Sequence, residues 1–135
     1  MAPESPLSKK LQIKTGAKVL VLEAPDGYLQ ELEPLPDGAQ VRQRADGAFD
    51  VVQLFATAKK ELDHGIPAAL RATKPGGVLW ISWPKQTAKR VTDLTRDSLR
   101  EYVERFGLQP VASIAVNEVW SALRFKRIEQ AAAGT

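Results

Sequence analysis

Lys18-Val-Leu-Val-Leu-Glu-Ala-Pro-Asp-Gly27 is the stretch of this 135-residue chain that decides its fold. Its first half is an unbroken aliphatic run, which favours a strand covered on both faces. Its second half is a bend, and open α/β sheets bind ligands where such a strand ends. A phosphate-binding loop at this place needs glycines, so that backbone N–H groups approach the ligand closely. Only Gly27 is present, while Glu23, Ala24 and Pro25 occupy the bend, so the stretch indicates an architecture more clearly than an activity.

The composition is that of one ordinary water-soluble domain. Hydrophobic residues make up 44% of the chain and charged residues 26%. No apolar run approaches the ~20 residues that a bilayer span needs, and the first residues lack the apolar segment of a secretory signal. The chain has no cysteine, which excludes disulfides and thiolate metal or redox chemistry. We therefore expect a cytoplasmic protein without a membrane partner.

The charge balance favours anionic partners only weakly. The formal net charge is +3, with 16 acidic residues among the basic ones. The densest basic cluster in the sequence is the loop that holds Lys85, Lys89 and Arg90. Nucleic-acid binding normally needs basic residues gathered on one surface or beside base-stacking aromatics. We expect no nucleic-acid partner, and an anion or nucleotide binder that uses this loop is kept as an alternative.

The order of apolar runs and amphipathic stretches predicts a single α/β domain over residues 11–128. A flexible arm over 1–10 and a frayed tail over 129–135 are predicted to flank it. Strands are predicted over 19–22, 40–44, 49–55, 78–83, 111–116 and 119–125, and helices over 27–35, 57–73 and 93–106. The last two strands are joined too closely for a helical crossover, so they must pair antiparallel. The elements define a three-layer, mostly parallel sheet with a C-terminal antiparallel hairpin.

Two motifs resemble those of the S-adenosylmethionine-dependent methyltransferases. Phe49-Asp50-Val51-Val52 is similar to the start of that family's fourth strand, and Lys74-Pro75-Gly76-Gly77 to the turn before its fifth. The antiparallel hairpin over 111–125 corresponds to the one that closes the family's Rossmann-like sheet. The resemblance covers most of the chain and implies that fold.

The chain departs from the methyltransferase pattern at the cofactor loop. That family usually carries an acidic residue on its first strand, followed by a Gly-x-Gly-x-Gly turn. Aligned on the first strand, Val21 takes the acidic position, and Glu23, Pro25 and Gly27 take those of the three glycines. Pro25 offers no N–H donor. The interval over 23–49 holds one helix and one strand instead of two of each, so the resemblance implies a truncated fold that lacks part of the adenine wall.

The chain also resembles a bacterial family of small proteins of unknown function with a truncated methyltransferase-like fold. The residues that carry this resemblance are Leu20-Val-Leu-Glu-Ala-Pro-Asp-Gly-Tyr28, Leu79-Trp-Ile-Ser-Trp-Pro-Lys85, Thr92-Asp-Leu-Thr95 and Trp120-Ser-Ala-Leu-Arg-Phe125. This likeness spans nearly all of residues 7–127. It implies a fold and brings no established activity.

The bend and the end of the strand over 78–83 are predicted to lie at one edge of the sheet and to form a ligand rim. The rim residues are Ala24, Asp26, Gly27, Ser82, Trp83, Lys85 and Arg90. Asp26 could accept hydrogen bonds from a ligand, Trp83 could stack on a planar group, and Lys85 could pair with an anion. Each feature has a structural alternative. Pro-Asp-Gly is also a turn sequence, and Trp83 could plug a core left open by the missing unit.

No catalytic constellation or metal site is predicted. His64 is the only histidine, and neither a second histidine nor a cysteine is available to complete a metal site. We therefore predict a non-catalytic methyltransferase-like module, with a degenerate cofactor loop and no bound S-adenosylmethionine, that binds a small molecule or a protein. The first alternative is a methyltransferase with a divergent site, and the second is the anion or nucleotide binder. A homodimer would cover the sheet edge that truncation exposes.

Overall fold

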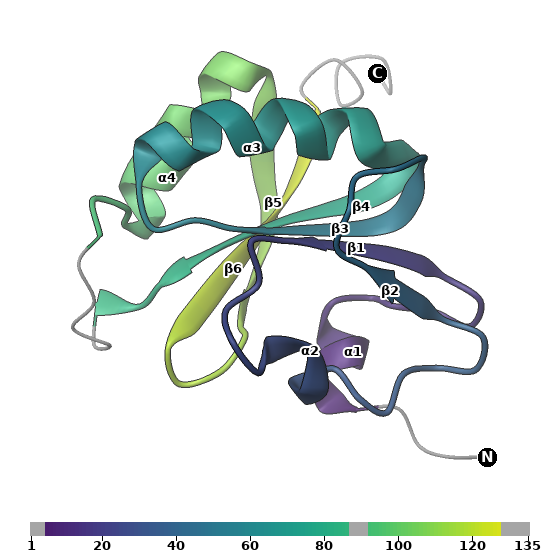
Figure 1. Cartoon of the computed structure of the whole chain (residues 1–135). Helices are drawn as coiled ribbons and strands as arrows, with labels where there is room; N and C mark the ends of the chain where they lie inside the picture. The colour runs from purple at the N-terminus through teal and green to yellow at the C-terminus, as the bar shows by residue number, and fades with distance from the viewer. Residues whose placement is uncertain (1–4, 87–91, 128–135) are drawn as a thin grey trace.

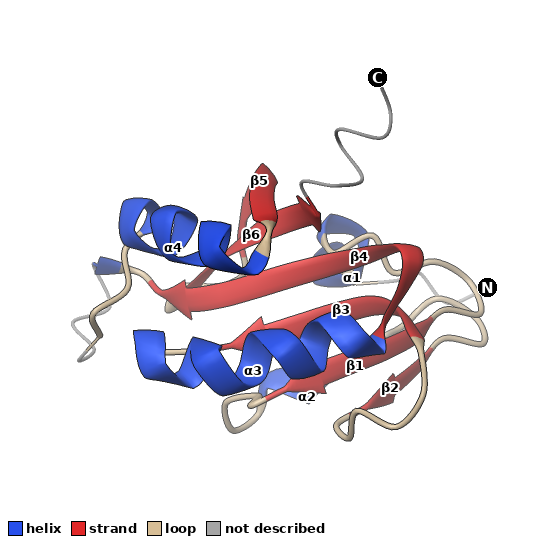
Figure 2. Ribbon diagram, turned by 90° about the horizontal axis from the view of Figure 1, so that it is seen from above, coloured by secondary structure: helices blue, strands red, loops and turns tan. Residues whose placement is uncertain are grey.

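A six-stranded sheet divides the protein into two sides, as seen in the computed structural model, which describes residues 5–86 and 92–127 (Figures 1 and 2). The strand order is β2-β1-β3-β4-β6-β5. The strands are β1 (Lys18–Leu22), β2 (Gln40–Arg42), β3 (Phe49–Phe55), β4 (Thr73–Pro84), β5 (Leu108–Ala115) and β6 (Trp120–Arg127). The first four are parallel, and β6 lies antiparallel between β4 and β5. The predicted α/β sheet with a C-terminal antiparallel hairpin is confirmed.

Helices cover both faces and complete the three layers (Figure 1). One face carries α3 (Lys59–Ala72) and α4 (Arg96–Val103), which continues into the 3-10 turn η2 (Glu104–Phe106). The other face carries the short helices α1 (Pro6–Lys10) and α2 (Tyr28–Glu31). No helix in the described part of the chain is both long and apolar enough to cross a membrane.

Each strand sequence matches the faces that it must bury. Leu20, Val52 and Ile81 on β1, β3 and β4 are fully buried, because helices lie on both sides of these strands. On β6 the side chains alternate between the two faces of the sheet. Leu123 and Phe125 pack toward α3 and α4, and Trp120 and Ala122 pack toward α1 and α2.

The interval between β1 and β3 is short, as predicted. It contains only α2 and the three-residue β2, which pairs with Lys18–Leu20 and forms one edge of the sheet. The sheet therefore ends at β2, one strand–helix unit short of the methyltransferase pattern.

The prediction of a flexible arm over residues 1–10 is wrong for residues 5–10. Ser5 caps α1 by accepting the Ser8 N–H, and the hydroxyls of Ser5 and Ser8 both donate to Leu32 O at 2.7 Å. Just after α1, the carbonyl of Leu11 accepts the Trp80 Nε1–H at 3.0 Å. The segment is ordered because Leu7 and Leu11 cover apolar residues of the sheet. The predicted tail over 129–135 lies outside the described residues.

Several element boundaries differ from the sequence prediction, and α2 and β2 are shorter than the predicted 27–35 and 40–44. β4 begins at Thr73 and β5 at Leu108, both earlier than predicted. α3 has Ala58 as its N-cap, while the Glu61 carboxylate accepts the N–H groups of Thr57 and Ala58. α3 runs without interruption from Lys59 to Ala72, although Pro67 lies inside it.

Leu11→Ala tests whether the N-terminal segment belongs to the core. Leu11 is 1% exposed, so truncating it should lower the free energy of unfolding by about 2–5 kcal/mol. Lys9→Ala, at an exposed position of α1, should change that free energy by less than about 0.5 kcal/mol. Urea unfolding followed by circular dichroism measures both free energies. If both variants have equally small effects, the segment is a flexible arm and not part of the core.

Candidate functional site

The bend after β1 is a tight turn that leads directly into α2. Glu23 takes a left-handed backbone conformation with φ +59°, a region that favours glycine. Gly27 follows with φ +80° and ψ −4°, and the Tyr28 N–H donates to Pro25 O at 3.1 Å. These angles match the third residue of a type II turn, which requires positive φ. The structural alternative for Pro25-Asp26-Gly27, a turn that starts a helix, describes the observed backbone.

Tyr28 lies beneath this bend and is anchored by a buried chain of hydrogen bonds. Its hydroxyl donates to Gln53 Oε1 at 2.5 Å, and Gln53 Nε2 donates to Ser82 Oγ at 3.0 Å. Tyr28 and Ser82 are fully buried, and Gln53 is 1% exposed. The chain of bonds thus connects the start of α2 to β3 and to the end of β4.

Aromatic rings fill the α2 side of the same edge. Tyr28 meets Phe55 edge-on with ring centroids 4.6 Å apart, and Phe55 meets Trp120 at 5.0 Å. Phe55 ends β3, and Trp120 opens β6 opposite the last residue of β4. At these separations no planar ligand fits between the rings. The carboxyl edge beneath the bend is therefore packed with side chains of this protein.

Burial sets the protonation of the Tyr28 hydroxyl. Removal from water raises the pKa of Tyr28 well above its ordinary value, and the hydrogen bond to Gln53 lowers it only in part. The hydroxyl therefore remains a neutral donor at physiological pH, as its bond to the amide oxygen requires.

The predicted rim residues of the bend are accessible. Asp26 and Gly27 are exposed, and Ala24 is half-buried. A Cβ added at Gly27 would meet no atom within 4 Å, so this side of the bend faces open space. A ligand role for these three residues stays a prediction.

The predicted rim residues at the end of β4 face in different directions. Ser82 points toward Gln53, whereas the side chain of Trp83 packs in the core beneath α3 and α4 and is 4% exposed. Lys85 is half-buried, and its backbone N–H donates to Val119 O at 2.7 Å. Arg90, like Lys89 of the basic loop, lies outside the described residues. The structure thus brings Ser82 into the polar chain and Trp83 into the core, and a ligand contact by either stays a prediction.

The segment that leads into α4 is fastened to the start of α3. The Thr92 hydroxyl donates to Thr57 O at 2.6 Å, and Asp93 Oδ1 accepts the Lys59 N–H at 2.9 Å. Thr95 caps α4 by a reciprocal pair of hydrogen bonds with Ser98. Thr95 is therefore the N-cap of α4, whereas the Asp93 carboxylate accepts the first free N–H of α3.

The residues at this edge differ from the glycine-rich S-adenosylmethionine loop of the fold. Pro25 has no N–H to offer, and Glu23 places a side chain at a position where the fold usually has glycine. The space beneath the bend is taken by Tyr28 and Phe55, whose rings are in contact. The described residues also contain no group of three His, Cys, Asp or Glu side chains that could hold a metal ion.

Comparisons with known structures identify the fold. No protein-family model matches this chain, and no curated protein sequence matches it. Solved structures do match, and those compared below are 11–16% identical to the chain.

Three of these structures show the range of the similarity. DhpI in a complex with SAM and HEP has a TM-score of 0.61 at 15% identity, over 90% of this chain and 84% of its own. The fibrillarin pre-rRNA processing protein of Methanococcus jannaschii scores 0.62 at 16% identity, over 85% of this chain and 68% of its own. A SAM-dependent methyltransferase of Thiobacillus denitrificans, in complex with S-adenosyl-L-homocysteine, scores 0.57 at 11% identity, over 90% and 89%. The chain therefore has the Rossmann-like fold of SAM-dependent methyltransferases, whereas its likeness to a bacterial family of unknown function stays a prediction.

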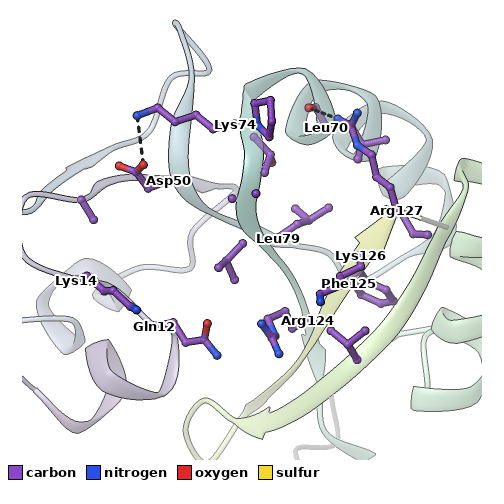
Figure 3. Close-up of a pocket in the computed structure, with 18 of the residues that line it drawn as sticks. Gln12, Lys14, Asp50, Leu70, Lys74, Leu79, Arg124, Phe125, Lys126 and Arg127 are labelled. Carbon is purple, nitrogen blue, oxygen red and sulfur yellow. Dashed lines mark hydrogen bonds and ion pairs between the residues drawn. The ribbon is translucent and has the colours of Figure 1, made fainter. Parts of the chain in front are cut away.

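The opposite edge of the sheet, where the parallel strands begin, carries a feature that the sequence analysis missed. A cavity of about 1090 Å³ opens there between the segment before β1, the α3–β4 junction and the end of β6 (Figure 3). Its charged lining comes from segments far apart in the sequence, so no short window shows it. Asp50 at the start of β3 is its carboxylate, and it accepts the Lys18 N–H at 2.8 Å and pairs with Lys74 at 3.2 Å.

Tyr28→Phe tests the buried hydrogen-bond chain. The change leaves Gln53 Oε1 buried without its donor, so the free energy of unfolding should fall by about 1–3 kcal/mol. Tyr102→Phe is the matched control, because the Tyr102 hydroxyl donates to Asp63 at the surface. Its effect should be clearly smaller than that of Tyr28→Phe, because water replaces the lost partner of the exposed Asp63. Urea unfolding of both variants gives the comparison, and a Tyr28→Phe effect no larger than the control would contradict the anchoring role.

Asp50→Asn tests the electrostatics of the opposite edge. The hydrogen bond from the Lys18 backbone, and then Lys74, lower the pKa of Asp50. A lowered pKa stabilises the fold above the ordinary carboxyl value near ~3.9, and this contribution is lost as the pH falls through the lower folded value. The wild type should exceed Asp50→Asn in stability at pH 6 by less than about 1 kcal/mol, because the carboxylate is well exposed. Unfolding curves from pH 6 downward should show the difference vanish in acid, and a constant difference would refute the assignment.

Proposed function

We propose that this protein is a non-catalytic binding module built on the methyltransferase fold, with no S-adenosylmethionine site at the carboxyl edge of its sheet. The observation that carries the proposal is Tyr28, fully buried beneath the bend where the cofactor loop of this fold lies. The rings of Tyr28, Phe55 and Trp120 occupy the space on that side of the edge.

The packing beneath the bend resists rearrangement. If Tyr28 moved aside for a ligand, Gln53 would lose its donor while staying inside the sheet. Each buried polar group left without a partner costs about 1–3 kcal/mol. The ring contacts with Phe55 would be lost as well. A ligand would have to offset both costs before it gained any affinity.

The bend itself supports the same proposal. Anion and nucleotide loops work through several backbone N–H groups that point at the ligand. Here Pro25 has no N–H, and the Tyr28 N–H is used within the turn. Glu23 adds a carboxylate where the fold usually has glycine.

A methyltransferase with a divergent site is the competing proposal. It is supported by the fold and by the exposed Asp26 at the carboxyl edge, where a carboxylate could contact a ligand. The two proposals differ in whether the protein binds S-adenosylmethionine or its product S-adenosylhomocysteine.

Isothermal titration with both compounds decides between the proposals. We expect no saturable heat from this protein at concentrations up to about 1 mM. The Thiobacillus denitrificans methyltransferase, whose structure holds S-adenosyl-L-homocysteine, serves as the positive control. Incubation of cell extract with tritiated S-adenosylmethionine should likewise show no methyl transfer that depends on this protein.

Micromolar binding that Asp26→Ala or Gly27→Ala weakens would overturn the non-catalytic proposal and locate the site at the bend. Methyl transfer that depends on the protein would also overturn the non-catalytic proposal. Gly27→Ala is strained by about 1–2 kcal/mol at its positive φ, so the folding of that variant is checked by circular dichroism.

A further inference from the structure

The cavity at the amino edge of the parallel strands combines walls from both halves of the fold. Gln12 and Lys14 contribute from the segment before β1, and Lys74 and Gly77 from the α3–β4 junction. The end of β6 supplies Arg124 and the residues that follow it (Figure 3). The bend after β1 lies at the other edge of the sheet, so an inference about this cavity is independent of the proposed function.

The lining is strongly cationic. It contains five basic side chains and one carboxylate: Lys14, Lys74, Arg124, Lys126 and Arg127, and Asp50. Its excess of positive charge is larger than the net +3 of the whole chain. A concave surface with one sign of charge concentrates counter-ions of the opposite sign.

Some of these charged side chains form hydrogen bonds or ion pairs within the protein, and others do not. Asp50 pairs with Lys74, and Arg127 donates to Leu70 O at 2.9 Å. Among the described residues, the side chains of Lys14 and Lys126 take part in no hydrogen bond or ion pair. Arg124 Nε is buried and has no hydrogen-bond partner among them.

The buried Arg124 Nε–H is a hydrogen-bond donor without an acceptor in the described structure. A buried N–H left unpaired costs about 1–3 kcal/mol, and an acceptor supplied by a ligand removes that cost. Lys126 lies on the same face of β6, two residues further on. In Figure 3, Gln12 and Lys14 lie across the cavity from Arg124. The guanidinium fork matches two oxygens of a phosphoryl group, and the lysines add point charges.

The α3–β4 turn gives the cavity a fixed wall. A Cβ at Gly77 would lie 2.9 Å from Lys74 O and 3.1 Å from Asp50 O. Only glycine allows this close approach of the turn to the start of β3. Lys74, on this wall, pairs with Asp50 at 3.2 Å.

The rest of the lining is partly polar and partly apolar. Its polar side chains are those of Gln12, Thr15, Thr73 and Gln109. Val78, Leu79, Leu108 and Val111 form an apolar wall, and Val111 is 39% exposed. A cavity of about 1090 Å³ is slightly larger than the roughly 300–1,000 Å³ of ordinary small-molecule sites. The cations gather in a hollow instead of following an extended groove, which favours a small anion over a nucleic-acid strand.

We propose that the amino-edge cavity binds a nucleotide-sized organic phosphate, with Arg124, Lys126 and Lys14 holding the phosphoryl oxygens and the apolar wall contacting the body of the ligand. This site differs from the bend after β1 and from the basic loop that holds Lys85.

Isothermal titration at low ionic strength tests the site, with magnesium-free ATP, pyrophosphate and adenosine as probes. ATP should bind saturably with a Kd below about 1 mM, pyrophosphate more weakly, and adenosine not at all. No saturation with ATP or pyrophosphate would overturn the proposal, and so would adenosine binding as tightly as ATP. A single-stranded RNA oligonucleotide that binds more tightly than ATP and competes with it would overturn it in favour of a polymer.

Matched charge variants locate the site. The double variant Lys14→Gln, Lys126→Gln removes two exposed cations from the cavity. It should weaken ATP binding at least about tenfold. Arg42→Gln with Arg44→Gln removes the same charge at the β2 edge, where both residues are exposed, and should weaken ATP less than about twofold. Equal weakening by the two pairs would show general electrostatic attraction and overturn the site.

Arg124 variants test the guanidinium itself. Arg124→Lys keeps the charge but loses the planar guanidinium fork. It should therefore weaken ATP binding less than Arg124→Gln does, and more than the double change at Arg42 and Arg44 does. Urea unfolding checks that both variants fold. If neither variant changes ATP affinity, Arg124 is not a ligand and the proposed geometry is wrong.

Discussion

One buried amide constrains much of this structure. Gln53 lies on the central strand β3, paired in register with Val21 on one side and Trp80 on the other. A buried amide group is costly unless its oxygen and nitrogen find partners. Tyr28 supplies the donor and Ser82 the acceptor, so three elements are tied together at the carboxyl side of the sheet.

The bend after β1 follows from that constraint. For Tyr28 to reach Gln53, the chain must turn beneath the sheet within the five residues 23–27. Left-handed backbone at Glu23 and at Gly27 achieves this turn. The residues that distinguish this bend from a glycine-rich cofactor loop are thus the residues that deliver a ring to the core. Glu23 at a usual glycine position and the Tyr28–Gln53 hydrogen bond both indicate that the bend serves to bring Tyr28 into the core.

The sequence predicted the strands and the hairpin because their signals are local. The bounds of β3 were predicted in full, since an aliphatic run between turn residues needs no distant information. α1 was missed because a five-residue helix with one leucine looks like a flexible arm in the sequence. Its contacts become visible only in the fold, where Ser5 and Ser8 donate to Leu32 O, 27 and 24 residues away. The partners of Gln53 are equally distant in sequence. At the predicted rim, Ser82 and Trp83 lie on opposite faces of β4 because side chains alternate along a strand. The sequence does not show which residues cover each face.

The cationic cavity was beyond the reach of sequence patterns for a topological reason. Its cations without a side-chain partner in the described part of the chain lie near position 14 and around positions 124–126, about 110 residues apart in the sequence. They meet because β6 runs antiparallel to its neighbour β4. In a fully parallel sheet, the carboxyl end of that strand would lie at the edge that holds the bend after β1. The reversed strand instead brings Arg124 and Lys126 to the amino ends of β3 and β4, where the segment before β1 supplies Lys14. The closing hairpin therefore places the basic residues of β6 at the edge opposite to the one where open α/β sheets bind ligands.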